Sequence, residues 1–65
     1  MRIEVNGTPQ EVEADTLGAV LSELGHPAEG VATALNGEFV ARGERGSTRL
    51  HEGDRVEVLA PMKGG

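Results

Sequence analysis

The stretch DTLGAVLSELGHP, residues 15–27, changes the period of the hydrophobic pattern and thereby decides the fold class. Asp15 or Thr16 is suited to cap the start of a helix, and Gly25 and Pro27 are typical of a helix end. The large apolar residues between them are spaced as on one face of an α-helix: Leu17, Val20, Leu21 and Leu24. We therefore predict one main helix in this stretch.

Gly18 lies inside this predicted helix, where glycine costs up to about 1 kcal/mol relative to alanine. Its presence suggests that another segment of the protein approaches the helix closely at this point, without indicating which one. Further along, GERGS (43–47) is polar and rich in glycine, which is typical of a surface loop.

Strand patterns precede the helix. MRIEVNG, residues 1–7, alternates Ile3 and Val5 with charged side chains and ends in Asn-Gly, the strongest short hairpin signal. TPQEVEA, residues 8–14, brings the chain back with Val12 between two glutamates. The first part of the sequence therefore predicts a β-hairpin.

Strand patterns also follow the helix. A third strand is predicted over residues 31–35, followed by a second Asn-Gly pair and a short strand at Phe39 and Val40. The segment TRLHEGDRVEVLA (48–60) contains a tight turn at HEGD and then the clearest alternation in the molecule, over residues 56–60. We expect this last strand to belong to the same sheet.

A helix between two hairpin-like halves must pack on one face of the sheet, because its apolar stripe has no other surface to cover. The helix is also a crossover long enough to let two strands run parallel. The predicted fold is therefore α+β, a β-grasp (ubiquitin-like) domain with a mixed sheet of four to five strands and one main helix on one face. Residues 1–60 form this domain in the prediction, and residues 61–65 form a flexible Gly-Gly tail.

Composition excludes several classes of function. The protein has 65 residues, with six basic and eleven acidic residues and a formal net charge of −5. This balance argues against nucleic acid as a partner and favours a protein with a basic surface. Cysteine is absent, which excludes disulfides, thiolate metal sites and a cysteine nucleophile. A domain of this size has little room for an enclosed active site, and no apolar run predicts a membrane segment, so we expect a cytoplasmic protein.

The usual catalytic side chains lack the partners that catalysis needs. Neither His26 nor His51 has a second ligand at a metal-binding spacing. Glu4, Glu11 and Glu13 fit the outer face of a hairpin better than a cleft in which acid–base groups converge. We therefore expect no metal, no cofactor and no catalytic residue in this protein.

Two features suggest contact with other proteins. If the alternate residues of the last strand face the helix, Leu59 faces outward, and Phe39 or Val40 is a neighbour in a docking patch. Pairing is expected to stop at Pro61, after which the tail extends at most ~17 Å. Gly64 and Gly65 have no Cβ and fit a narrow channel, although the same composition is equally typical of a merely disordered end.

The whole sequence resembles the ThiS family, the ubiquitin-like sulfur carrier proteins of thiamine biosynthesis. The resemblance is carried by VNG after the first strand, by LNGEFV (35–40) and by GDRVEVLAPMKGG (53–65). It implies that a ThiF-like ATP-dependent enzyme adenylates the carboxylate of Gly65, and that a sulfur-donor protein then supplies the sulfur of a thiocarboxylate (1-thioglycine). The preceding residues, Pro61, Met62, Lys63 and Gly64, would present this group.

The resemblance also implies that thiazole synthase takes the sulfur for the thiazole ring of thiamine, and that the protein is a co-substrate and not an enzyme. Three alternatives remain open at this point. The small subunit of molybdopterin synthase shares the fold, tail and thiocarboxylate, although its sequence is usually longer. A ubiquitin-like modifier uses the same tail to form isopeptide bonds. In a non-reactive β-grasp interaction module, the Gly-Gly ending would be incidental.

Overall fold

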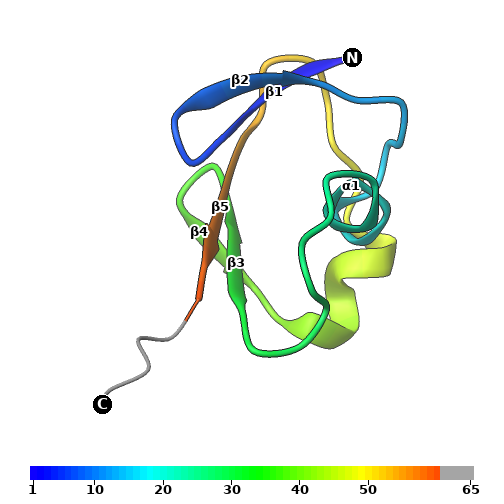
Figure 1. Cartoon of the computed structure of the whole chain (residues 1–65). Helices are drawn as coiled ribbons and strands as arrows, with labels where there is room; N and C mark the ends of the chain where they lie inside the picture. Colours follow the sequence, from blue (N-terminus) through cyan, green and yellow to red (C-terminus); the bar gives the residue numbers. More distant parts are fainter. Residues whose placement is uncertain (61–65) are drawn as a thin grey trace.

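Two hairpins separated by a helix form the framework of the molecule (Figure 1). The computed structural model describes residues 1–60. Within that range lie the strands β1 (Arg2–Val5), β2 (Thr8–Glu11), β3 (Ala32–Leu35), β4 (Glu38–Val40) and β5 (Arg55–Leu59), the helix α1 (Leu17–Glu23), and the 3-10 helix η1 (Arg42–Ser47).

The strands form a mixed sheet in the order β2-β1-β5-β3-β4. β1 and β5 are parallel neighbours, while the two hairpins and the β3–β5 pair are antiparallel. Both Asn-Gly pairs make the predicted turns: Asn6 and Asn36 each have a φ of 51°, and a glycine with positive φ follows each of them. The predicted β-grasp arrangement is confirmed, and β5 lies at its centre.

The core lies between α1 and one face of the sheet (Figure 1). Alternate residues of β1 and β5 point into it, as the period-two pattern predicts. Its buried hydrophobic residues are Ile3, Val5, Val12, Leu17, Val20, Leu21, Val40, Leu50, Val56 and Val58. The opposite face of the sheet is thereby left for solvent or for a partner.

Of the two candidate helix caps, Thr16 is the one that the structure uses. Its hydroxyl accepts a hydrogen bond from the main-chain amide of Ala19 at 3.2 Å. Leu24 caps the other end, and Gly25 follows it with a φ of 83°, a left-handed conformation that favours glycine. The helix signals in the sequence are therefore correct at both ends.

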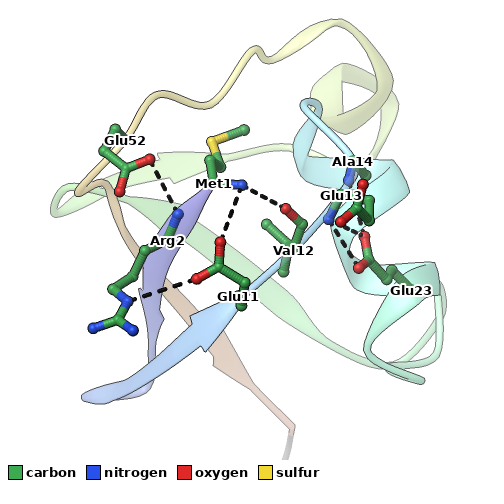
Figure 2. Close-up of polar contacts among 8 residues, drawn as sticks. All are labelled: Met1, Arg2, Glu11, Val12, Glu13, Ala14, Glu23 and Glu52. Carbon is green, nitrogen blue, oxygen red and sulfur yellow. Dashed lines mark hydrogen bonds and ion pairs between the residues drawn. The ribbon is translucent and has the colours of Figure 1, made fainter.

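The connection from β2 to α1 is held by the carboxylate of Glu23, in the last turn of the helix (Figure 2). The main-chain amide of Glu13 donates to Oε2 at 2.9 Å, and that of Ala14 donates to Oε1 at 2.9 Å. These two donors, Ala14 first and then Glu13, lower the pKa of Glu23 below its usual 4.5, because they favour the charged carboxylate.

Replacing Glu23 by Gln should lower stability at neutral pH, because the charged acceptor of two main-chain donors is lost. A carboxylate with a lowered pKa stabilises the fold above its unfolded pKa of about 4.5, and this contribution disappears as the pH falls through the folded value. The difference between wild type and E23Q in urea unfolding should therefore shrink between neutral pH and about pH 3. E38Q, an exposed carboxylate on β4, is the control; an equal response of both variants to pH would contradict the role of Glu23.

The polar stretch after β4 is not the surface loop that its composition predicts. Residues 42–47 form η1, and the side chain of Arg45 is buried. Gly18 of α1 explains the close packing between the two helices: a Cβ at this position would lie 3.4 Å from the carbonyl carbon of Arg45 and from the amide nitrogen of Gly46. The close approach predicted at Gly18 is thus confirmed, and the approaching segment is η1.

Candidate functional site

Apolar side chains gather on the outer face of the sheet, on the side away from α1. Phe39 is 74% exposed and Leu59 is 64% exposed, as the outward direction predicted for Leu59 requires. In the register of the sheet, Phe39 lies opposite Ala34, and Leu59 lies opposite Ala32. We call these residues, Ala32, Ala34, Phe39 and Leu59, the apolar patch.

Val40 does not belong to the apolar patch, and its assignment to a docking surface is wrong. It is only 8% exposed and is part of the core, where it lies opposite the buried Thr33. Adjacent residues of a strand point to opposite faces of a sheet, so only one of Phe39 and Val40 can face outward. Of the two alternatives, Phe39 is therefore the neighbour of Leu59 on the outer face, together with the two alanines of β3.

The apolar patch continues into a shallow pocket at the end of β5. Its lining residues are Gly30, Val31, Ala32, Leu59 and Ala60. Toward the other end of β5 the outer face becomes charged, with Arg55 and Glu57 exposed. The apolar part of the sheet therefore lies where the described part of the protein stops, at the base of the tail.

Arg45 holds in place the segment that leads into β3. This segment forms one wall of the pocket. Its guanidinium donates to the carbonyl oxygens of Ala28 at 2.9 Å and Val31 at 2.8 Å, and its Nε donates to the Thr33 hydroxyl at 3.0 Å. Thr33 in turn donates to the carbonyl oxygen of Val40 at 2.9 Å. Composition did not predict this network, because the sequence gives no sign that one arginine of a glycine-rich stretch is buried.

The five residues of the predicted tail lie outside the described residues. These are the proposed sulfur attachment residue Gly65 and the presenting residues Gly64, Lys63, Met62 and Pro61. The assignments made for them, and the boundary between a domain over residues 1–60 and a tail over 61–65, stay predictions. What the structure supplies is the surface next to Ala60, from which the tail continues.

The two histidines lie on separate segments, His26 in the loop after α1 and His51 at the turn before β5. His26 is half-buried after α1, with its main-chain amide bonded to the carbonyl of Leu21. The exposed side chain of His51 lies 3.8 Å from Asp54. Among the residues that the structure describes, no three His, Asp or Glu side chains are grouped to hold a metal ion. Over the same residues, no helix has the length and apolar character needed to cross a membrane.

A mixed sheet with parallel central strands and a helix across one face defines the molecule as a ubiquitin-like β-grasp protein. The model of the ThiS family matches residues 3–65. The chain belongs to the ThiS family.

Individual relatives agree with this assignment. The sequence is 44% identical to the sulfur carrier protein ThiS of Thermus thermophilus, over 94% of this chain and 95% of the relative. The crystal structure of the thiamine biosynthesis protein ThiS from Geobacter metallireducens superposes with a TM-score of 0.84, covers all of both chains and is 39% identical. A thiazole synthase of Paramagnetospirillum magneticum is 32% identical to the whole sequence, which matches 20% of that longer protein.

Proposed function

We propose that this protein carries sulfur on the terminal carboxylate of Gly65 and delivers it for the thiazole ring of thiamine. As a member of the ThiS family, it is a sulfur carrier of thiamine biosynthesis. This favours the thiamine branch over a molybdopterin synthase subunit, a protein modifier and a non-reactive module. The observation that carries the residue assignment is that the family match extends over the whole Gly-Gly sequence, to residue 65.

The chemistry needs activation before sulfur transfer, because a carboxylate is anionic and a poor electrophile. A carboxylate oxygen of Gly65 attacks the α-phosphorus of ATP, and pyrophosphate leaves. A persulfide on the donor protein then attacks the carbonyl carbon, and AMP leaves with the electron pair of the broken C–O bond. A thiol of the donor cleaves the S–S bond of the resulting acyl disulfide, which leaves the thiocarboxylate on Gly65 and a disulfide on the donor. The absence of cysteine is compatible with this route, because the sulfur is bound to the terminal carbonyl carbon of the main chain and not to a side chain.

Catalysis in this proposal belongs to partner proteins. A ThiF-like adenylating enzyme binds ATP and activates the carboxylate, and thiazole synthase accepts the sulfur. The match to a fifth of a thiazole synthase supports the second partner, because a carrier-like sequence within the same polypeptide as the acceptor enzyme keeps the two together at high effective concentration. The net charge of −5 suits partners with basic surfaces around the tail channel.

The apolar patch is the surface that we propose these partners bind. Aromatic and aliphatic residues that become buried at the centre of an interface contribute most of its binding energy. Phe39 and Leu59 are the large apolar side chains that the structure leaves exposed among residues 1–60. Docking here places the partner directly beside Ala60, so that the residues after it enter the partner's active site while the domain stays outside.

Replacing Phe39 by Ala should raise the KM of the adenylating enzyme for the carrier about tenfold, since truncating a buried interface anchor costs about 1–2 kcal/mol. The thermal stability of the carrier should stay nearly unchanged, because the side chain is 74% exposed in the free protein. The matched control is E11A, on β2 at the opposite end of the sheet. Equal KM values for F39A and E11A would show that the partner binds another surface.

The proposed function is tested by incubating the protein with a ThiF-like enzyme, ATP and a sulfur-donor protein and measuring its intact mass. We expect the mass to rise by the difference between one sulfur and one oxygen atom, and only when ATP is present. An unchanged mass, with an activating enzyme shown to load another carrier, would contradict the proposal. High-mass conjugates in place of the exchange would indicate a protein modifier.

A further inference from the structure

β5 has a neighbour on both sides for only part of its length. β3 pairs with it from Val56 to Leu59. β1 pairs only with the first two residues, Arg55 and Val56, because the backbone then turns away into the β1–β2 hairpin. The last residues of β5 therefore lie beyond the end of β1 and do not pair with its backbone. The amide and the carbonyl group of Val58 point to this side of β5.

The side chain of Asn6 forms hydrogen bonds with β5 beyond the point where the backbone pairing of β1 ends. The main-chain amide of Val58 donates to Oδ1 of Asn6 at 2.8 Å, and Nδ2 of Asn6 donates to the carbonyl oxygen of Val58 at 3.1 Å. The main-chain amide of Asn6 also donates to the carbonyl oxygen of Val56 at 2.9 Å. The side-chain amide thus acts as the peptide group of one more strand residue, and it satisfies both polar backbone groups of Val58.

The second hairpin contains a matched contact at the other end of β5. The main-chain amide of Arg55 donates to Oδ1 of Asn36 at 2.9 Å, and the main-chain amide of Asn36 donates to the carbonyl oxygen of Arg55 at 2.7 Å. Nδ2 of Asn36 donates to the carboxylate of Asp54 at 3.1 Å. Both asparagines have the same φ of 51°, but only Asn6 bonds to the end of β5 from which the tail continues.

We propose that Asn6 is a positioning residue for sulfur loading, which acts through Val58 on the end of β5. The inference rests on the proposed function and adds a residue that is distant in sequence from the tail and lies outside the apolar patch. Strand ends open at little free-energy cost when their hydrogen bonds are few. Without Asn6, the end of β5 keeps pairing on the β3 side only, so Leu59 and Ala60 lose their fixed direction.

The affinity of a partner depends on the fraction of carrier molecules in which the end of β5 is ordered. A partner that binds only the ordered end of β5 sees an affinity reduced by the fraction of molecules in that state. Losing the two hydrogen bonds of Asn6 should raise the KM of the adenylating enzyme for the carrier about fivefold to tenfold. The value of kcat should change much less, because docked molecules have the same tail.

The test uses N6G and N36G, since glycine tolerates the positive φ at both positions. We expect both variants to lose stability, but only N6G to show the higher KM, with faster hydrogen exchange at the amides of Val58 and Leu59. N36G should instead speed exchange at Arg55 and keep the wild-type KM. N6D, which keeps the acceptor for Val58 and loses the donor, should fall between wild type and N6G.

Equal KM values for N6G and N36G would overturn the inference, because Asn6 would then act only on folding. Unchanged exchange at Val58 and Leu59 in N6G would overturn it as well. If the proposed function itself is wrong, the wild-type protein gains no sulfur, and this result distinguishes the two cases. In that case the exchange rates, which need no partner, still decide whether Asn6 orders the end of β5.

Discussion

Deleting Gly65 should abolish sulfur loading while leaving the free energy of unfolding of the domain unchanged. The deletion leaves a carboxylate on Gly64, but this group is one residue, or about 3.5 Å, closer to the domain. Reacting atoms must approach within about 3–3.5 Å, and a displacement of about 1 Å already costs about 100-fold in rate. With docking on the apolar patch unchanged, a shorter tail cannot bring the carboxylate to the α-phosphorus of ATP. The measurement is the intact mass after loading, together with the urea unfolding midpoint.

A matched control keeps the length of the tail and changes a side chain. E11A keeps all five tail residues and removes one exposed charge from β2, so we expect it to gain sulfur to the same extent as wild type. Loading of the Gly65 deletion at a wild-type rate would contradict the assignment of the reactive residue. Loss of loading in both variants would show that the effect of the deletion is not specific to the tail.

Replacing Arg45 by Met should cost about 2–4 kcal/mol of unfolding free energy, which is the second large effect that we expect. The methionine fills part of the volume but donates no hydrogen bond to the carbonyl oxygens of Ala28 and Val31 or to the Thr33 hydroxyl. A buried acceptor that loses its partner costs about 1–3 kcal/mol. The loss is large for a domain whose total stability is on the order of 3–10 kcal/mol.

The control for this variant is R42M in the same 3-10 helix. Arg42 is exposed and lies 3.3 Å from the carboxylate of Glu29, and such surface ion pairs contribute about 0–1 kcal/mol. Urea unfolding should therefore separate the two variants clearly. Similar losses for R42M and R45M would mean that the buried hydrogen bonds of Arg45 do not hold the fold together.

Local signals were sufficient to predict the framework of the fold. The two Asn-Gly pairs fix hairpin turns through their own backbone conformations, and Thr16 and Gly25 mark the ends of α1 through local bonds and a left-handed φ. Each of these depends on neighbours within a few residues. A parallel pair of strands was expected because a crossover helix permits one, and the structure shows that β1 and β5 form it.

What the sequence did not predict depends on contacts between distant segments. Which of Phe39 and Val40 faces outward is decided by the register of β4 on β3, and a three-residue strand has too short an alternation to fix it. The burial of Arg45 depends on acceptors that the segment before β3 brings to it. Asn6 was predicted as a turn residue only, because its bonds reach Val58, 52 positions further along the sequence.

Transfer of labelled sulfur tests the central claim most directly. The carrier is first loaded with isotopically labelled sulfur and purified, and its loading is verified by intact mass. It is then incubated with thiazole synthase and the other substrates of that enzyme. We predict that the label appears in the thiazole product and that the carrier returns to its unmodified mass, with fragmentation placing the exchanged atom on Gly65. A thiazole product without label, formed while the carrier keeps its sulfur, would contradict the account.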